Sequence, residues 1–220
     1  MSKKILGLIH TSATLVPVFA QLCKAKLPQV ETFNIVDDSL VRAIGVRGGL
    51  KADIARRVAG YIASADIGGA DYILVTCSSI GPAVEAAVPF SRVPVLRVDQ
   101  PMADRAVQTG RKIGVIATLR TTLEPTADLV RRRAAAAGRP VEIVSHLCEG
   151  AFEALMGGDP GKHDAMVAAA LKVLAGQVDV ILLAQASMAR VVDTLPEADR
   201  RIPILASPPI AIDYLATILT

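Results

Sequence analysis

Two nine-residue segments of this 220-residue chain repeat each other and differ at one chemically important position. Asp71–Ser79 (DYILVTCSS) aligns without a gap on Asp179–Ser187 (DVILLAQAS), and Cys77 in the first copy stands opposite Gln185 in the second. An ionised thiol is a base or a nucleophile, whereas a carboxamide forms hydrogen bonds and delivers no proton at neutral pH. The pair predicts a site with a proton-transfer group on one side and a hydrogen-bonding group on the other.

The repeat extends well beyond these two segments. Gly7–Thr11 matches Gly114–Thr118, and Val93–Leu96 matches Ile202–Leu205 at nearly the same offset. A duplicated unit tends to fold as two similar halves, and a ligand held between them meets related surfaces on both sides.

Strand-like apolar runs alternate with helical patterns along the chain, which is typical of βαβ units and a parallel sheet with right-handed crossovers. The expected strands are Ile5–Ile9, Gln29–Ile35, Tyr72–Thr76, Pro94–Val98, Lys112–Ala117, Val141–Ser145, Val180–Ala184 and Pro203–Leu205. The expected helices are Leu15–Lys26, Leu50–Ala65, Gly81–Ala87, Met102–Thr109, Leu123–Ala137, Ala151–Met156, Asp164–Ala175, Met188–Leu195 and Ile210–Leu219.

Four strands fall in each repeat. This predicts an α/β fold of two pseudo-symmetric domains, each a roughly four-stranded parallel sheet flanked by helices, with an active-site cleft between them. We place the first domain at residues 1–98 plus 207–220 and the second at residues 99–206. One continuous doubly wound sheet is the competing architecture.

Small polar residues follow several of the expected strands. Ligands of open parallel sheets gather beyond the carboxyl ends of the strands, where helix N-termini and hydroxyl groups can hold a carboxylate or a phosphate. The alternative is that these side chains only cap helices. The candidate residues are His10, Thr11, Ser78, Ser79, Thr118, Thr121, Ala186 and Ser187.

The composition favours a soluble α/β protein. The hydrophobic fraction is 52% and the mean hydropathy is +0.45, yet each apolar run is interrupted within about ten residues, short of the ~20 that span a bilayer. Three cysteines without framework spacing suit a reducing compartment, so we expect a cytoplasmic protein. With a net charge of +3 and 3% aromatic residues, neither a nucleic acid nor a membrane is an expected partner.

The three cysteines differ in context. Cys23 lies within an amphipathic helical pattern and Cys148 follows a strand, so both are interpreted as small buried hydrophobes. Cys77 ends a buried strand just before an expected helix, a place where thiols become reactive. We found no metal-binding spacing, and Gly45–Gly49 lacks the order of a dinucleotide-binding loop, so no metal site is expected.

The chain resembles the aspartate/glutamate racemase superfamily, which includes hydantoin racemases, maleate isomerases and arylmalonate decarboxylases. The resemblance covers essentially the whole chain and rests on the motifs Ile73–Ser79, Gly114–Pro125 and Ile181–Ala189. It implies two pseudo-symmetric α/β domains, no cofactor and a small carboxylate-bearing substrate gripped between them. In racemizing members, a cysteine from each domain handles the proton on opposite faces of a planar carbanion.

The resemblance also implies roles for single residues. Cys77 occupies the first-cysteine position, and Gln185 replaces the second cysteine. His10 stands where glutamate racemases have an Asp, which puts recognition of an α-ammonium group in doubt. The resemblance and the repeat together place the substrate carboxylate at Thr11, Ser78, Ser79, Thr118, Thr121 and Ser187, with Ala186 beside them.

The replacement of a thiol by an amide limits the chemistry. Two-base racemization needs a second proton-transfer group, for which His10 and His146 are the candidates. The expected function is a cofactor-independent racemase or isomerase acting at the carbon α to a carboxylate, with Cys77 as acid/base or nucleophile and Gln185 polarising the intermediate. A single-thiol decarboxylase of a malonate-like acid and a non-catalytic small-acid binding protein are the alternatives. The sequence leaves the oligomeric state open, a homo-oligomer included.

Overall fold

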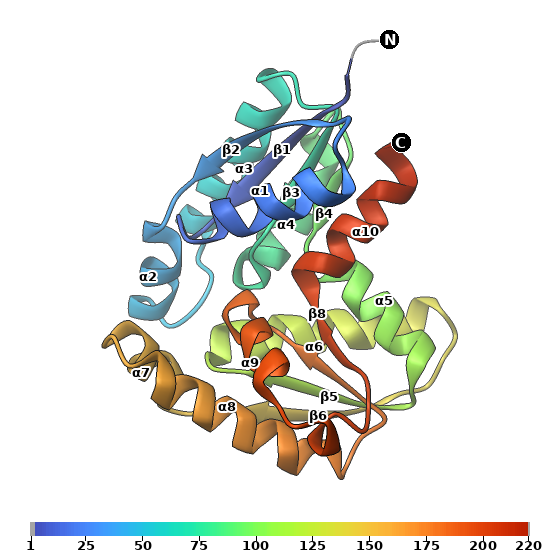
Figure 1. Ribbon diagram of the computed structural model, residues 1–220. Helices are drawn as coiled ribbons and strands as arrows, with labels where there is room; N and C mark the ends of the chain where they lie inside the picture. Colours follow the sequence, from blue (N-terminus) through green and yellow to red (C-terminus); the bar gives the residue numbers. More distant parts are fainter. Residues whose placement is uncertain (1–2, 220) are drawn as a thin grey trace. The chain divides into compact units, whose positions relative to one another are not determined.

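The computed structural model describes residues 3–219, which fold into two compact units. The first unit runs to Asp99 and resumes at Pro208, and the second spans Gln100–Ser207. Each unit contains one four-stranded sheet with helices on both of its faces (Figure 1). The expected fold of two α/β units is therefore confirmed, and the single continuous sheet is wrong.

The two sheets have the same topology. Their strand orders are β2-β1-β3-β4 and β6-β5-β7-β8, and every paired strand is parallel to its neighbour. Counted from the start of each unit, the two orders are identical, so the sequence repeat is a repeat of structure. The strands are β1 (Ile5–His10), β2 (Glu31–Val36), β3 (Tyr72–Val75), β4 (Val95–Arg97), β5 (Lys112–Ala117), β6 (Glu142–Leu147), β7 (Val180–Leu183) and β8 (Ile204–Ala206).

In the first unit, helices from distant parts of the sequence cover the sheet. On one face, α1 (Leu15–Lys26) and α10 (Ser207–Leu219) enclose a core that includes Phe19, Leu74 and Leu215. On the other face, α2 (Ser39–Val46), α3 (Ala52–Ile67) and α4 (Gly81–Ala87) pack on Ile73 and Val75. Because both faces of β3 are covered, its residues form the continuous apolar run expected of a buried parallel strand.

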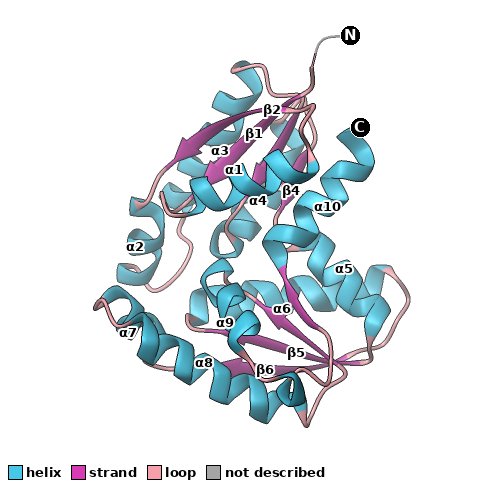
Figure 2. Cartoon of the chain, in the orientation of Figure 1, coloured by secondary structure: helices cyan, strands magenta, loops and turns pink. Residues whose placement is uncertain are grey.

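The second unit is layered in the same way (Figure 2). On one face, α5 (Gln100–Thr109) and α6 (Arg120–Ala136) contact each other and the strands β5 and β7. On the other, α7 (Ala151–Met156), α8 (Pro160–Ala175) and α9 (Ala189–Thr194) enclose a core around Ile181 and Leu183. Short 3-10 turns complete the chain: η1 (Ser78–Ile80), η2 (Val88–Phe90), η3 (Ala186–Met188) and η4 (Glu197–Asp199).

The repeated Asp71 and Asp179 have a structural role at the amino ends of the strands. Asp71 Oδ2 accepts a hydrogen bond from Ile5 N at 2.8 Å, and Asp179 Oδ2 accepts one from Lys112 N, also at 2.8 Å. Each carboxylate fixes the start of the central strand of its sheet, and these bonds lower the pKa of both Asp side chains. Asp71 and Asp179 therefore recur because they stabilise the fold. They are not site candidates, since the candidate site residues lie at the carboxyl ends of the strands.

The structure differs from the expected elements in several places, of which the following are examples. The helix α2 was not predicted, although Leu40 and Ile44 have the i, i+4 spacing of a helix face and are both buried. The helix α8 begins at Pro160, four residues earlier than expected, because Asp159 caps it by accepting from Lys162 N. The strands β2 and β6 each end later than predicted, at Val36 and Leu147.

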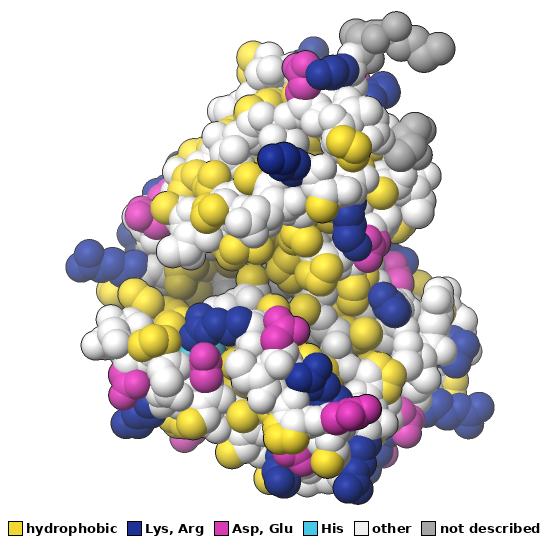
Figure 3. All heavy atoms as spheres, viewed as in Figure 1, with side chains coloured by type: hydrophobic (Ala, Val, Ile, Leu, Met, Phe, Trp, Pro, Cys, Tyr) yellow, Lys and Arg dark blue, Asp and Glu magenta, His cyan; other side chains and the backbone are white. Residues whose placement is uncertain are grey.

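The surface carries many exposed ion pairs, such as Lys3 with Glu31 and Arg132 with Asp128. On the face shown in Figure 3, Lys and Arg side chains are interspersed with Asp and Glu. Among residues 3–219, no helix combines the length and the apolar character needed to span a membrane.

Candidate active site

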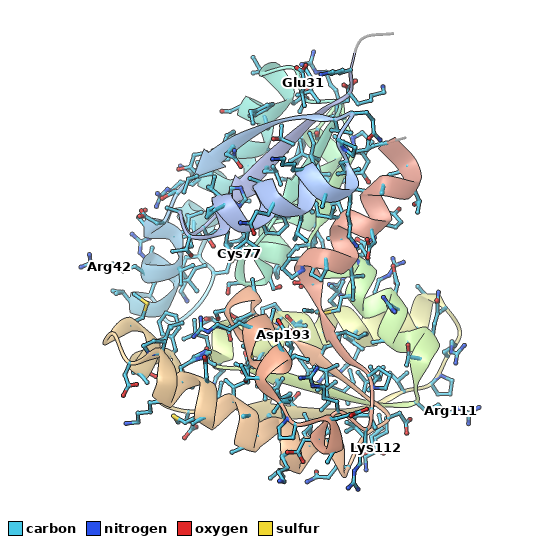
Figure 4. The ribbon with its side chains drawn as sticks, viewed as in Figure 1. Glu31, Arg42, Cys77, Arg111, Lys112 and Asp193 are labelled. Carbon is cyan, nitrogen blue, oxygen red and sulfur yellow. The ribbon has the colours of Figure 1, made fainter. Side chains whose placement is uncertain are left out.

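Cys77 leaves the carboxyl end of β3 and enters a short turn. Its backbone is extended (φ −130°, ψ 120°), Ser78–Ile80 then form η1, and α4 starts at Gly81. Figure 4 shows Cys77 at the opposite end of the first sheet from Glu31, which begins β2. The Cys77 side chain is half-buried, so the thiol reaches the carboxyl edge of the sheet without being sealed in the core.

Gln185 occupies the same backbone position in the second unit. It leaves β7 with φ −130° and ψ 138°, Ala186–Met188 form η3, and α9 starts at Ala189. The correspondence drawn from the sequence repeat is therefore also a correspondence of local geometry. The two turns differ in the side chain that each presents at its first residue.

The Gln185 side chain is held by Thr118, the residue that follows β5. Its Oε1 accepts hydrogen bonds from Thr118 N at 2.6 Å and from Thr118 Oγ1 at 3.0 Å. With the amide oxygen occupied by two donors, the NH₂ group is the part of Gln185 left to contact a ligand. The N–H and the hydroxyl group of Thr118 both donate to this oxygen, so a substrate carboxylate that binds Thr118 would have to displace the Gln185 oxygen.

His10 is enclosed at the end of β1, beside the residue that precedes the thiol. Its side chain is 0% exposed, with Nδ1 2.9 Å from Thr76 Oγ1 and Nε2 2.8 Å from Asn34 Oδ1. Burial lowers the pKa of His10, although the hydrogen bond with Asn34 works in the opposite direction. With both ring nitrogens engaged, His10 supports Thr76 and has no nitrogen free for a substrate.

The other predicted residues lie at the carboxyl edges of the sheets. Thr11, Ser78 and Ser79 are buried in the first unit around the start of η1. In the second unit, Thr121 lies half-buried in the first turn of α6, and Ala186 and Ser187 are half-buried in η3. Each unit thus carries its own candidates at or after the carboxyl ends of its strands, namely His10, Thr11, Cys77, Ser78 and Ser79 in one and Thr118, Thr121, Gln185, Ala186 and Ser187 in the other.

The remaining cysteines are buried. Cys23 in α1 is 4% exposed and Cys148 after β6 is 5% exposed, and burial raises the pKa of each thiol to about 11. Cys148 lies beside the end of β5, because its N–H donates to Ala117 O at 2.8 Å, one residue before Thr118. A thiol that stays protonated to such a high pH is a poor base at neutrality.

Two residues of the first unit that hold buried side chains in place were missed from the sequence. Asn34 fixes the His10 ring, and Arg97 is a buried cation in β4, next to β3. A signal for Arg97 existed, because it is the one charged residue within the expected strand Pro94–Val98. Nothing in the sequence marks Asn34, whose role depends on the pairing of β1 with β2.

A metal ion is not suggested by the side chains. Within the part of the chain that the structure describes, no three His, Cys, Asp or Glu side chains are grouped so that they could hold one.

Comparison with known proteins places this geometry in a family. Residues 5–215 match the family model described as Asp/Glu/Hydantoin racemase. A search of curated proteins returned no match.

Solved structures share the fold at low sequence identity. Allantoin racemase from Klebsiella pneumoniae is 16% identical with a TM-score of 0.73, over 98% of this chain and 87% of that one. Glutamate racemase from Francisella tularensis in complex with D-glutamate is 12% identical with a TM-score of 0.73, over 100% and 81%. Aspartate racemase from Picrophilus torridus is 14% identical with a TM-score of 0.71, over 97% and 94%.

The family model spans nearly the whole chain, and its match agrees with the two-unit α/β architecture. The chain belongs to the Asp/Glu/hydantoin racemase family and is a racemase-like isomerase.

Proposed function

We propose that the protein is a cofactor-independent isomerase that moves the proton on the carbon α to the carboxylate of a small acid, with Cys77 as the acid/base group. The proposal is supported chiefly by the matched turns of the two units, one carrying a half-buried thiol and the other an amide whose oxygen is already hydrogen-bonded. A fold relative solved with D-glutamate makes small amino acids and related carboxylates the first substrates to test.

In the proposed reaction, the Cys77 thiolate takes the α-proton. The electrons of the broken C–H bond move onto the carbonyl or carboxylate oxygen and produce an enolate. The Gln185 NH₂ donates a hydrogen bond to that oxygen, which is the role of an oxyanion-hole amide. The Cys77 thiol then returns a proton to the carbon and is a thiolate again. Return to the original face only exchanges the hydrogen, and return after the planar enolate has turned over in the site gives the opposite enantiomer.

The remaining candidates would hold the carboxylate. Thr11, Ser78, Ser79 and Ser187 carry hydroxyl groups, and the three serines lie in the turns η1 and η3 that follow β3 and β7. Ala186 would contribute through its backbone, and Thr121 through its hydroxyl. We assign Thr118 to positioning Gln185, because its N–H and hydroxyl both point to the amide oxygen.

We also propose a reducing compartment such as the cytoplasm, since all three cysteines are free thiols. The family assignment does not favour the decarboxylase or the non-catalytic binding protein over the racemase-like enzyme.

The proposal is tested by solvent exchange. Aspartate, glutamate, hydantoins and related small acids are incubated in D₂O with the wild-type protein, with Cys77→Ala, and with Cys148→Ala as the matched control. We expect deuterium at the α-carbon of at least one substrate with wild type and with Cys148→Ala. With Cys77→Ala, we expect the rate to fall by about 10²-fold or more. Exchange by Cys77→Ala at the wild-type rate would contradict the assignment.

A further inference from the structure

A buried ionic network lies beneath the turn that carries Cys77. The Arg97 guanidinium is 3% exposed and forms a fork on Asp99, with Nε 3.0 Å from Oδ1 and Nη2 2.8 Å from Oδ2. Its third nitrogen, Nη1, donates to Glu85 Oε1 at 2.7 Å. Asp99 is 0% exposed, so both charges of the fork are out of water and depend on each other.

The guanidinium fills the space beside Gly81. A Cβ placed on Gly81 would lie 2.2 Å from Arg97 Cζ and 2.3 Å from Nη2, closer than real contacts allow. Gly81 is the first residue of α4 and directly follows η1. Because Glu85 also belongs to α4, Arg97 contacts this helix twice, once at its first residue and once one turn later.

Arg97 and Cys77 lie toward the same helical layer of the sheet. Arg97 pairs with Val75 across β3 and β4, and Val75 belongs to the core cluster on the α3 and α4 side. Cys77, two residues beyond Val75, packs against the same cluster. The guanidinium therefore sits on the side of the sheet toward which the thiol-bearing turn folds.

The other unit lacks this network at the matching positions. In the sequence repeat, Gly81 corresponds to Ala189 and Arg97 to Ala206. At the start of α9, Ala189 carries a methyl group in the place where α4 has Gly81 and the Arg97 guanidinium. The pairing of Gly81 with Arg97 is thus a feature of the unit that carries the thiol, and the unit that carries the amide uses two alanines.

We propose that Arg97, locked by Asp99 and Glu85 and packed on Gly81, is a positioning residue that holds the turn of Cys77, Ser78 and Ser79 in its reactive geometry. The inference rests on the proposed function of Cys77 and adds a residue that would not touch the substrate. A shift of about 1 Å in a reacting group can cost up to about 100-fold in rate. Loss of Arg97 should therefore act mainly on kcat.

The test gives the first unit the two alanines that the second unit has at positions 189 and 206. The variant is Gly81→Ala/Arg97→Ala/Asp99→Asn, in which the third change avoids leaving a buried carboxylate without its cation. The matched control is Arg133→Met, which removes a forked Arg–Asp pair (with Asp104) from the second unit. The first readout needs no substrate, namely hydrogen exchange of the peptide covering residues 76–84.

We expect amide exchange in this peptide to accelerate at least tenfold in the triple variant, with β1 unchanged and with wild-type exchange in Arg133→Met. On a substrate that wild type turns over, we expect kcat to fall at least tenfold while KM stays within threefold. Unchanged exchange in residues 76–84 would overturn the proposal, and so would accelerated exchange with an unchanged kcat. If wild type turned over no substrate, the proposed function would fail, and the exchange measurement would still decide whether Arg97 orders the turn.

Discussion

The three thiols of this protein differ in how deeply they are buried. Cys23 and Cys148 lie inside helix-to-sheet cores, whereas Cys77 lies half-buried at the carboxyl edge of β3. Cys23 and Cys148 therefore pack as small hydrophobes, whereas Cys77 is the thiol to which the proposed function assigns proton transfer.

This difference predicts selective modification. At pH 8, iodoacetamide should add once to the native protein, at Cys77, because only about 0.1% of a thiol with a pKa near 11 is ionised at that pH. Intact-mass spectrometry of wild type and Cys77→Ser measures the number of adducts. An adduct that persists in native Cys77→Ser would show that one of the other thiols is accessible.

His10 predicts a pH dependence of stability. Its lowered pKa means that the folded protein keeps the ring neutral, while the unfolded chain binds a proton near pH 6.5. His10 thus contributes stability that is complete above pH 6.5 and is lost as the pH falls through the folded-state pKa. The free energy of unfolding in urea should fall from pH 7.5 to pH 5.0 by less in His10→Gln than in wild type. An equal fall in both proteins would contradict this role.

Among the elements, the repeated glycines mark close packing of a helix on a central strand. A Cβ on Gly114 in β5 would lie 2.8 Å from Leu174 Cδ2 and 3.1 Å from Val178 Cγ2. Gly7, its counterpart in β1, would meet Phe33 of β2 at 3.1 Å and Ala65 of α3 at 3.4 Å. The repeat preserves these glycines because the helical layer approaches the strand at that point.

Gly114→Ala should therefore destabilise the protein by about 1–3 kcal/mol through overpacking. Gly176→Ala is the matched control, because its Cβ would meet nothing closer than 3.8 Å and its φ of −81° suits alanine. The control should leave stability unchanged or raise it by up to about 1 kcal/mol. Urea denaturation of both variants makes the comparison, and equal stabilities would refute the packing argument.

Much of the fold could be predicted from the sequence because hydrophobic periodicity and the internal repeat point to the same elements. The bounds of α1, α4 and α7 were predicted to the residue, and the strands to within two. The helix α2 escaped prediction although α4 and α7 are shorter, because only Leu40 and Ile44 mark its buried face and Gly45 lies within it. The hydrogen bonds of Gln185 and His10 could not be predicted, because they join residues from strands that become neighbours only in the folded sheet.

At the level of the whole molecule, the two units repeat one topology, and their matching turns carry a thiol in one unit and an amide in the other. The backbone at residue 185 is already that of residue 77 in the other unit, so a thiol placed there would emerge from a matching turn. The amide is thus the feature that we hold responsible for one-sided proton transfer.

Gln185→Cys should accordingly gain proton transfer on the second face. For a substrate that wild type labels in D₂O, we expect the rate of conversion to the opposite enantiomer to rise by about tenfold or more, because a second acid/base group is supplied. Gln185→Ser, which offers no comparable acid at neutral pH, is the control. Chiral chromatography follows both enantiomers. An unchanged conversion rate in Gln185→Cys would contradict the idea that the amide at position 185 limits proton transfer to one face.

The stereochemical course of the wild-type reaction tests the single-thiol account most directly. One pure enantiomer of a substrate is incubated with wild type in D₂O, and α-deuterium content and enantiomeric excess are measured in the same samples over time. We predict that label enters with retention of configuration well before the opposite enantiomer accumulates, and that Cys77→Ala abolishes the labelling. Inversion that keeps pace with label incorporation would contradict the account, because it would require an acid on each face of the carbanion.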